Sequence, residues 1–234
     1  MKKEKILRNY YKKIIYSEEF LTILKSKRDN AIKLLEMFYR EGLSPYIHGS
    51  VARGDVHESS DFDIIFMKQI PPFKIEYILF KNDFKKYFRE IIMATPLDSI
   101  KLYIHLSELE TITLPLSRVN KNYTYFYNFG GKIDLDQLRS GKRVSGIDKR
   151  LVLIKPYSEG HEEISIIGNE QIAAKEVEVS VNFLNERKKV LLRRDKYGRT
   201  GVFLKRKIHL DETTESALKK LASQKPIIRK KLFE

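Results

Sequence analysis

Two aspartates separated by one residue, Asp61 and Asp63, are the side chains of this chain with the clearest chemical use. Side chains at alternate positions of a strand point to the same face, so both carboxylates would project together while Phe62 points away. Paired oxygen ligands suit Mg²⁺, which takes one or two protein carboxylates and fills its other positions with water and phosphate oxygens. Two such ions can stabilise both the attacking and the leaving oxygen of a phosphoryl transfer, so we expect two Mg²⁺ ions here.

A Gly-Ser turn precedes the aspartate pair, with ten residues between them. Gly49 lets the backbone approach a phosphate closely, and Ser50 offers a hydroxyl and an amide to phosphate oxygens. Arg53 is a further candidate phosphate contact. Apolar runs flank the segment at 45–47 and 64–67, so a bound nucleoside triphosphate explains this combination better than two unrelated solvated turns.

The pattern Gly49-Ser50, ten residues, then Asp61-x-Asp63 resembles the signature of the DNA polymerase beta type nucleotidyltransferase superfamily, and the neighbouring Ala52-Arg53-Gly54 and Ser60 resemble its small prokaryotic branch. The resemblance implies a mixed sheet flanked by helices. It also implies transfer of a nucleoside monophosphate from a triphosphate to a hydroxyl, with release of pyrophosphate. By this resemblance the Gly-Ser turn holds the triphosphate, and both aspartates are catalytic and bind the metals.

The superfamily resemblance also implies a third carboxylate on a later strand, which helps to deprotonate the attacking hydroxyl. Asp98 is our candidate, and Glu108 and Glu110 compete with it. The alternative for Asp98 is a structural one, in which it caps or turns the chain before a strand. A complete triad favours turnover, whereas its absence favours binding.

The composition restricts the class of protein. The chain has 234 residues and no cysteine, which excludes disulfides and thiolate metal sites and fits a reducing compartment. No apolar run approaches the roughly 20 residues of a membrane span. The sequence therefore predicts a soluble, cytoplasmic protein that does not contact the membrane.

The net charge of +14 lies mostly in the second half of the chain. Residues 1–117 hold 19 basic and 16 acidic residues, and residues 118–234 hold 26 and 15, so the halves carry +3 and +11. Residues 187–207 contain ten basic residues against the single acid Asp195. Such a basic stripe is typical of a surface that binds a polyanion, and the alternative is the solvated face of a lysine-rich protein.

The segment 171–187 resembles a helix-turn-helix. Ala174 allows the helices to cross closely, Val179 fills the turn, Ser180 caps the second helix and Leu184 faces the core. The turn departs from the usual pattern at Glu178, a position where glycine is common. A left-handed conformation of this glutamate would cost on the order of 1 kcal/mol.

Basic residues and two glycines at 193–201 lead into Val202-Phe203-Leu204, which predicts a wing hairpin and hence a winged helix. In such a module the second helix enters the major groove of DNA. The candidate base readers are Asn182 and Asn185, and the candidate phosphate contacts are Lys189, Arg194, Lys196 and Arg199. The alternative is a module that docks protein or only completes the fold.

The elements that position these residues indicate an α+β fold: a mixed-sheet nucleotidyltransferase domain over 1–160, a winged helix-turn-helix-like domain over 161–210 and a basic helix or tail over 211–234. Helical spacing predicts helices over 5–16, 22–40 and 74–94, and the alternation of apolar residues predicts strands over 46–48, 62–67, 100–106, 111–116 and 151–154. The aromatic cluster at 123–129 either stacks bases or forms a core. The five histidines show no metal-ligand spacing.

Two function classes follow. The first is a Mg²⁺-dependent nucleotidyltransferase that modifies a hydroxyl on nucleic acid or protein and is targeted by the C-terminal module. The second is a DNA-binding regulator or antitoxin-like protein whose nucleotidyltransferase fold binds nucleotide with little or no turnover. A protein partner or a homodimer is compatible with either.

Overall fold

The computed structural model describes residues 5–84 and 87–233. The chain forms two compact units, each assembled from separate segments. The first unit comprises 1–32, 47–60 and 124–200, and the second comprises 33–46, 61–123 and 201–234. Helices and strands occur in both, so the α+β class is confirmed. The domains predicted over 1–160, 161–210 and 211–234 are contiguous, whereas these units are interleaved along the chain.

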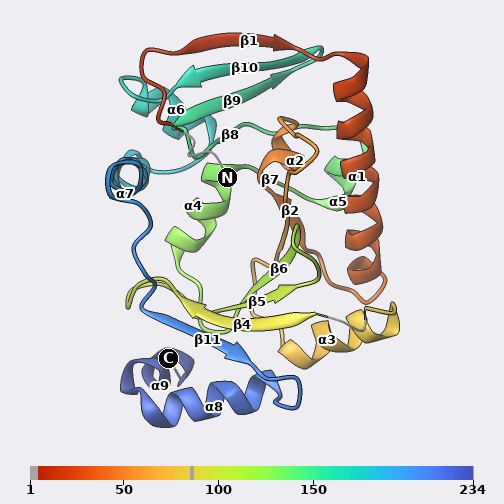
Figure 1. Ribbon diagram of the computed structural model, residues 1–234, viewed down its shortest axis with the longest axis vertical. Helices are drawn as coiled ribbons and strands as arrows, with labels where there is room; N and C mark the ends of the chain where they lie inside the picture. The colour runs from red at the N-terminus through yellow and green to blue at the C-terminus, as the bar shows by residue number, and fades with distance from the viewer. Residues whose placement is uncertain (1–4, 85–86, 234) are drawn as a thin grey trace. The chain divides into compact units, whose positions relative to one another are not determined.

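The first unit contains an antiparallel sheet in the order β1-β10-β9-β8 (Figure 1). Its strands are β1 (Tyr11–Ile15), β8 (Gly146–Ile147), β9 (Val152–Tyr157) and β10 (Gly160–Ser165). The helix predicted over 5–16 is therefore wrong. Tyr11 to Ile15 pair along β10, from Ile164 to Gly160, and these long-range hydrogen bonds outweigh the helical spacing of the apolar residues.

The other elements of the first unit lie before and after the Gly-Ser turn in the chain. They are the part of α1 (Glu18–Tyr39) up to residue 32, β2 (Tyr46–His48) from residue 47, α2 (Ser50–Arg53), α4 (Lys121–Gly130) from residue 124, β7 (Lys132–Ile133) and α5 (Leu135–Arg139). Strand β2 pairs antiparallel with β7 through Ile47 and Ile133. Helix α5 begins with a capping box between Asp134 and Gln137, which satisfies the first backbone amides of the helix.

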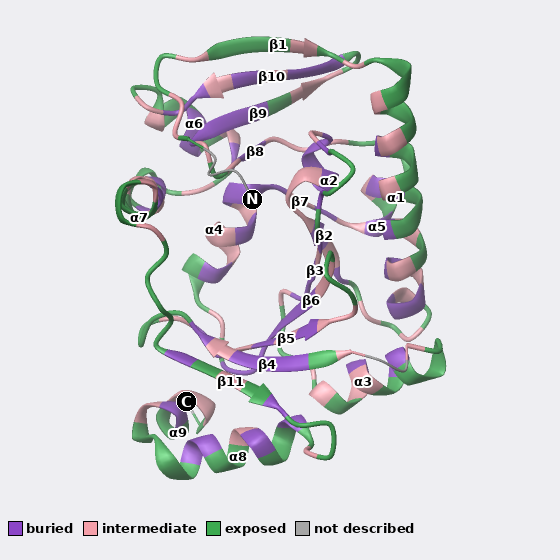
Figure 2. Ribbon diagram, in the orientation of Figure 1, coloured by how far each residue is buried: buried purple, intermediate pink, exposed green. Residues whose placement is uncertain are grey.

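Two further helices, α6 (Glu170–Glu176) and α7 (Val181–Tyr197), pack against the sheet of the first unit. Their apolar side chains form one buried cluster with residues of α4 and β8 to β10. Phe129, Leu153, Ala174 and Leu184 are among its members. The buried parts of these elements are purple in Figure 2. The helix-turn-helix segment is thus fixed by a shared core, which gives the exposed face of α7 a rigid support.

The turn between α6 and α7 has the conformation that the sequence predicts. Glu178 has φ of +53°, and Val179 N donates a 2.9 Å hydrogen bond to Ala174 O, as in a Schellman motif. The Ser180 side chain accepts a hydrogen bond from Phe183 N, so the predicted cap is confirmed. Leu184 is buried, as predicted.

We expect Glu178→Gly to raise the free energy of unfolding by on the order of 1 kcal/mol, because glycine adopts a positive φ without the clash of a Cβ atom. Lys175→Gly is the matched control. It replaces an exposed residue inside α6 and should lower stability by about 1 kcal/mol. Urea denaturation followed by circular dichroism measures both changes, and a loss of stability in Glu178→Gly would contradict the strain argument.

The predicted wing hairpin is wrong. Helix α7 continues to Tyr197, so Arg194 and Lys196 lie on the helix and not on a strand. The next strand, β11 (Leu204–Ile208), belongs to the second unit, where it pairs with β4 (Phe88–Met93). The two helices and the turn are present as predicted, but the chain after them completes another sheet, in which Leu204 pairs with Met93 and both are buried.

The second unit contains strands in the order β11-β4-β5-β6-β3. The strands not yet bounded are β3 (Phe62–Ile65), β5 (Lys101–His105) and β6 (Glu110–Pro115). Strands β3 and β6 run parallel and the other neighbours antiparallel, so the predicted mixed sheet is confirmed. The helix predicted over 74–94 is correct only in its first half, because α3 (Pro72–Lys81) ends and the chain returns as β4.

One face of this sheet is apolar and covered by helices. Ile64, Ile104 and Ile112 are buried on it. Arg89, on β4, forms an ion pair with Glu76 of α3, and Arg206, on β11, donates to Ala217 O of α8 (Thr214–Gln224). These contacts place α3 and α8 over the apolar face, with α9 (Pro226–Phe233) packed on α8. The opposite face carries the polar side chains of Asp63, Thr111 and His105 together with the buried Ile65, and is called the polar face below.

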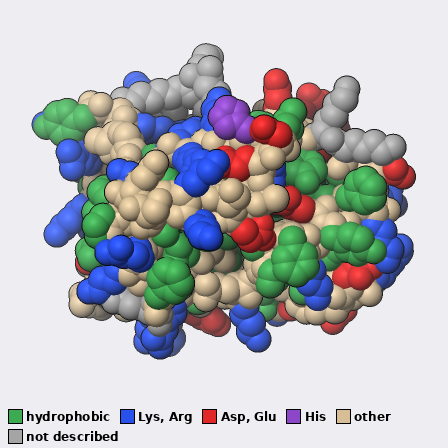
Figure 3. Space-filling model, turned by 90° about the horizontal axis from the view of Figure 1, so that it is seen from below, with side chains coloured by type: hydrophobic (Ala, Val, Ile, Leu, Met, Phe, Trp, Pro, Cys, Tyr) green, Lys and Arg blue, Asp and Glu red, His purple; other side chains and the backbone are tan. Residues whose placement is uncertain are grey.

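Lysine and arginine side chains do not gather in a single patch on the face of the molecule in Figure 3, where basic, acidic and hydrophobic side chains are intermixed. Among the described residues, no helix is both long and apolar enough to cross a membrane.

Candidate functional site

The Gly-Ser turn follows β2 in the first unit. Gly49 has φ of +89° and ψ of −144°, a conformation that is essentially restricted to glycine. The backbone conformation, and not crowding, therefore requires glycine here. A Cβ atom added to Gly49 would meet nothing within 4 Å, so the space beside this residue is open. Gly49 N donates a 2.9 Å hydrogen bond to Gly131 O, and Ser50 begins α2. The turn therefore has the open backbone that we expect where a phosphate approaches.

Arg53, predicted as a phosphate contact, is held by protein groups. Its guanidinium donates to both carboxylate oxygens of Asp55, at 3.0 and 2.9 Å, and to Gly130 O at 2.7 Å. The side chain is only 8% exposed. Burial opposes the charge, but the Asp55 carboxylate raises the pKa of Arg53 above its ordinary value. These contacts give Arg53 a structural role in fixing the chain after the turn, and its phosphate contact stays a prediction.

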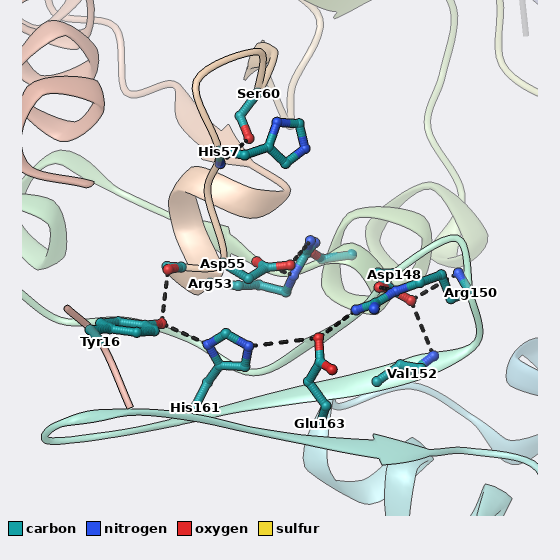
Figure 4. A network of polar contacts seen from close by, with 12 residues as sticks. Tyr16, Arg53, Asp55, His57, Ser60, Asp148, Arg150, Val152, His161 and Glu163 are labelled. Carbon is teal, nitrogen blue, oxygen red and sulfur yellow. Dashed lines mark hydrogen bonds and ion pairs between the residues drawn. The ribbon is translucent and has the colours of Figure 1, made fainter. Parts of the chain in front are cut away.

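A chain of polar contacts continues through the first unit (Figure 4). The Tyr16 hydroxyl donates to Gly54 O at 2.8 Å and contacts His161 Nδ1 at 2.9 Å. His161 Nε2 lies 3.8 Å from Glu163 Oε1. Arg150 then joins Glu163 to Asp148 through two short ion pairs. The network links β1, β9 and β10 to Gly54, the residue that ends α2.

Stability in acid should depend on Glu163. The His161 contact lowers the pKa of Glu163, as do hydrogen bonds from Tyr10 and Arg150, and together they bring it from 4.5 to about 2 despite partial burial. A carboxylate with a lowered folded-state pKa stabilises the fold above its ordinary pKa, and this contribution is lost as the pH falls. We therefore expect the free energy of unfolding to decrease from about pH 4.5 toward pH 2.

Urea denaturation between pH 2.5 and 6 measures this effect. Glu163→Gln should weaken the decrease in acid, whereas Glu162→Gln, on the opposite face of β10, should keep the wild-type pH dependence. An unchanged acid dependence in Glu163→Gln would assign the effect to other carboxylates.

The aspartate pair belongs to the second unit. Asp61 is exposed immediately before β3, and Asp63 is half-buried within it. The alternating Phe62 and Ile64 are buried on the opposite face, so Asp63 lies on the polar face of the sheet. Asp61 precedes the strand, and its place on the same face stays a prediction. Burial, followed by the charges of Asp63 and Asp98, raises the pKa of Tyr103 to about 12, which keeps this phenol protonated beside the carboxylates.

Asp61 and Asp63 supply oxygen ligands of the kind that Mg²⁺ prefers. Two hard carboxylates on one face can hold a Mg²⁺ ion that completes its shell with water and phosphate, so the residues fit such an ion. In the described part of the chain, no group of three or more histidine, cysteine, aspartate or glutamate side chains is arranged to hold a metal ion. Among the residues that the structure describes, the carboxylate pair therefore has no third protein ligand of these types.

The three candidates for the third carboxylate lie in different surroundings. Asp98 Oδ2 accepts hydrogen bonds from Thr95 N and Oγ1 at 2.9 and 2.8 Å. These contacts match the alternative role of Asp98, in which it stabilises the turn before a strand. Glu108 is exposed in the turn before β6. Glu110 pairs with Phe62 and so lies on the face opposite Asp63. Thr111, not a carboxylate, occupies the position beside Asp63 on β6.

The predicted nucleic-acid contacts lie on and just after α7. Four of these candidates share one face of the helix, because they are separated by three, four and seven residues along it: Asn182, Asn185, Lys189 and Lys196. Arg194 lies about 120° around the helix axis from Asn182. Asn185 is half-buried, the other five candidates are exposed, and Arg199 follows the helix.

No family model, curated protein or solved structure matches this chain.

Sequence reasoning missed the polar network of the first unit. His161, Glu163 and Ser165 alternate along β10 and are buried, although their types suggest a solvated strand face. The useful signal was the alternation itself, because it places three polar side chains on one side of a strand. Asp55, two residues after Arg53, was likewise a visible partner for that guanidinium.

Proposed function

We propose that this protein is a Mg²⁺-dependent nucleotidyltransferase that moves a nucleoside monophosphate from a nucleoside triphosphate to a hydroxyl on nucleic acid or protein. The observation that carries the proposal is the position of Asp63 on the polar face of β3, opposite the buried Phe62 and Ile64, with Asp61 exposed immediately before the strand. Gly49 supports it, because its backbone conformation and open surroundings suit a phosphate.

The roles of the residues follow from their chemistry. Asp61 and Asp63 would hold the metal, and Mg²⁺ would supply Lewis-acid polarisation of the phosphoryl oxygens when bound. The amide and hydroxyl of Ser50 would contact the triphosphate oxygens. The network around Tyr16 and Arg53 keeps Gly54 in place and thereby limits the conformations of the turn.

Label transfer tests the proposal. The protein is incubated with Mg²⁺ and triphosphates labelled at the α-phosphate, and candidate nucleic-acid and protein acceptors are separated and counted. We expect labelled acceptor and released pyrophosphate. The absence of label from every acceptor, in a protein that binds the triphosphate, would overturn the transferase assignment.

A second candidate function is a nucleotide-binding regulator or antitoxin-like protein with little or no turnover. Thr111 beside Asp63 favours it, because a threonine hydroxyl is a much weaker base than a carboxylate. Isothermal titration calorimetry separates the candidates, since a regulator binds triphosphate with Mg²⁺ and leaves it unconsumed after hours of incubation.

We also propose that the exposed face of α7 contacts duplex DNA. Lys189→Ala should weaken DNA binding and reduce the slope of log K against log salt by about 1, because one phosphate contact is lost. The control Lys219→Ala removes an exposed lysine from α8, so its net charge equals that of Lys189→Ala. We expect this control to bind DNA as tightly as the wild-type protein. Fluorescence anisotropy at several salt concentrations measures both. Equal losses in the two variants would indicate nonspecific attraction.

A further inference from the structure

A row of side chains crosses the polar face of the sheet in the second unit. Asp63 pairs with Thr111, Thr111 with His105, and His105 with Phe88, so the four lie side by side on β3, β6, β5 and β4. Directly paired residues of neighbouring strands project to the same face. Asp63 of the proposed metal site thus lies in the same row as an aromatic surface, which begins with His105 two strands away and ends with Phe88.

The rings on this surface are nearly parallel. The Phe88 and His105 centroids are 4.2 Å apart with an interplanar angle of 9°, and Tyr103 lies 6.3 Å from His105 at 19°. Burial lowers the pKa of His105, which favours the neutral ring. Phe88 is 50% exposed at the end of this row. An exposed ring above a second, parallel ring is a rigid surface on which a planar group can stack.

Cationic side chains line the same face. Lys207 pairs with Glu90 and Lys205 with Ile92, so both lysines share the face with Glu90 and Phe88. Lys205 Nζ lies 3.2 Å from Glu90 Oε2, which confirms its direction, and both lysines are exposed. A stacking surface beside exposed lysines combines the two features that single-stranded nucleic acids require, a flat apolar contact for bases and positive charge for the backbone.

We infer that this face binds a single-stranded nucleic-acid segment whose bases stack on Phe88 and whose phosphates contact Lys205 and Lys207. The inference rests on the proposed function and narrows its acceptor, because the strand would lie in the same row as Asp63. Single strands are favoured over duplexes because a base must be unpaired and unstacked from its neighbours to lie on the Phe88 ring.

The test uses short oligonucleotides that contain the fluorescent base 2-aminopurine, whose emission is quenched by stacking. Phe88→Leu keeps an apolar side chain at this position of β4 but removes the aromatic ring. We expect it to reduce the quenching of 2-aminopurine and to weaken oligonucleotide binding by roughly 5- to 100-fold. Phe88→Tyr keeps the ring and should restore both. Phe80→Leu is the matched control, because Phe80 is 70% exposed on α3, which covers the opposite face.

This experiment tests the inference separately from the proposed function, because quenching of 2-aminopurine fluorescence requires binding but no nucleotidyl transfer. An unchanged quench in Phe88→Leu, or an equal loss in Phe80→Leu, overturns the inference even if label transfer is observed. Loss of oligonucleotide binding in Lys189→Ala but not in Phe88→Leu would assign binding to α7 and also overturn it. A quench that depends on the Phe88 ring supports it even in a protein without transferase activity.

Discussion

Replacing Asp61 and Asp63 together by asparagine should abolish label transfer while leaving the fold intact. Loss of one preorganised electrostatic contact to a reacting group typically costs about 10²- to 10³-fold in rate, and this double change removes both carboxylates of the proposed metal site. We therefore expect transfer to fall by at least about 1,000-fold. The label-transfer assay under saturating Mg²⁺ measures the loss.

The fold should tolerate the change, since Asp61 is exposed and Asp63 is half-buried. Circular dichroism and urea denaturation verify this. Asp83→Asn is a useful control, because it removes an exposed carboxylate from the turn after α3. Transfer that persists in the double variant would exclude the pair from catalysis. Lost transfer in Asp83→Asn would point to a general effect of charge.

Arg53→Ala should lower the free energy of unfolding of the first unit by about 3–5 kcal/mol, the usual cost of breaking a buried ion pair from one side. The change leaves the Asp55 carboxylate with a poorly solvated charge and removes the donor to Gly130 O. Gly130 precedes Gly131, whose carbonyl oxygen accepts the hydrogen bond from Gly49 N, so triphosphate binding should weaken together with stability.

Two variants make the Arg53 result interpretable. Arg53→Met combined with Asp55→Leu removes both charges and should recover much of the lost stability, as apolar replacements of buried pairs often do. Arg139→Ala removes an arginine that is 51% exposed and paired with the exposed Asp136, so it should change stability little. If Arg53→Ala unfolds at the same urea concentration as wild type, the network does not support the turn as described.

The sequence predicted the parts of this fold whose order is set locally. The hairpin of β5 and β6 and the turn at Glu178 both depend on neighbouring residues. The failures involve distant partners. Residues 11–15 form a strand because β10 lies beside them, and residues 204–208 pair with β4 and not with a wing. No local pattern contains those partners.

The candidate site divides in the same way. The exposure of Asp61 and the glycine conformation at Gly49 follow from spacing and residue type. The contacts of Arg53 and the burial of Glu163 do not, because a charged residue in a sequence is expected to be solvated. Thr111 beside Asp63 could be found only from the register of β3 with β6.

The interleaving of the two units has a consequence for biosynthesis. The first unit needs β10 before β1 can pair, and the second needs β11 beside β4, so most of the chain must leave the ribosome before either sheet is complete. Contacts this distant in sequence are typical of slow-folding topologies. Nascent chains stopped short of residue 204 should present an unpaired β4 edge, which makes them substrates for chaperones and prone to aggregation.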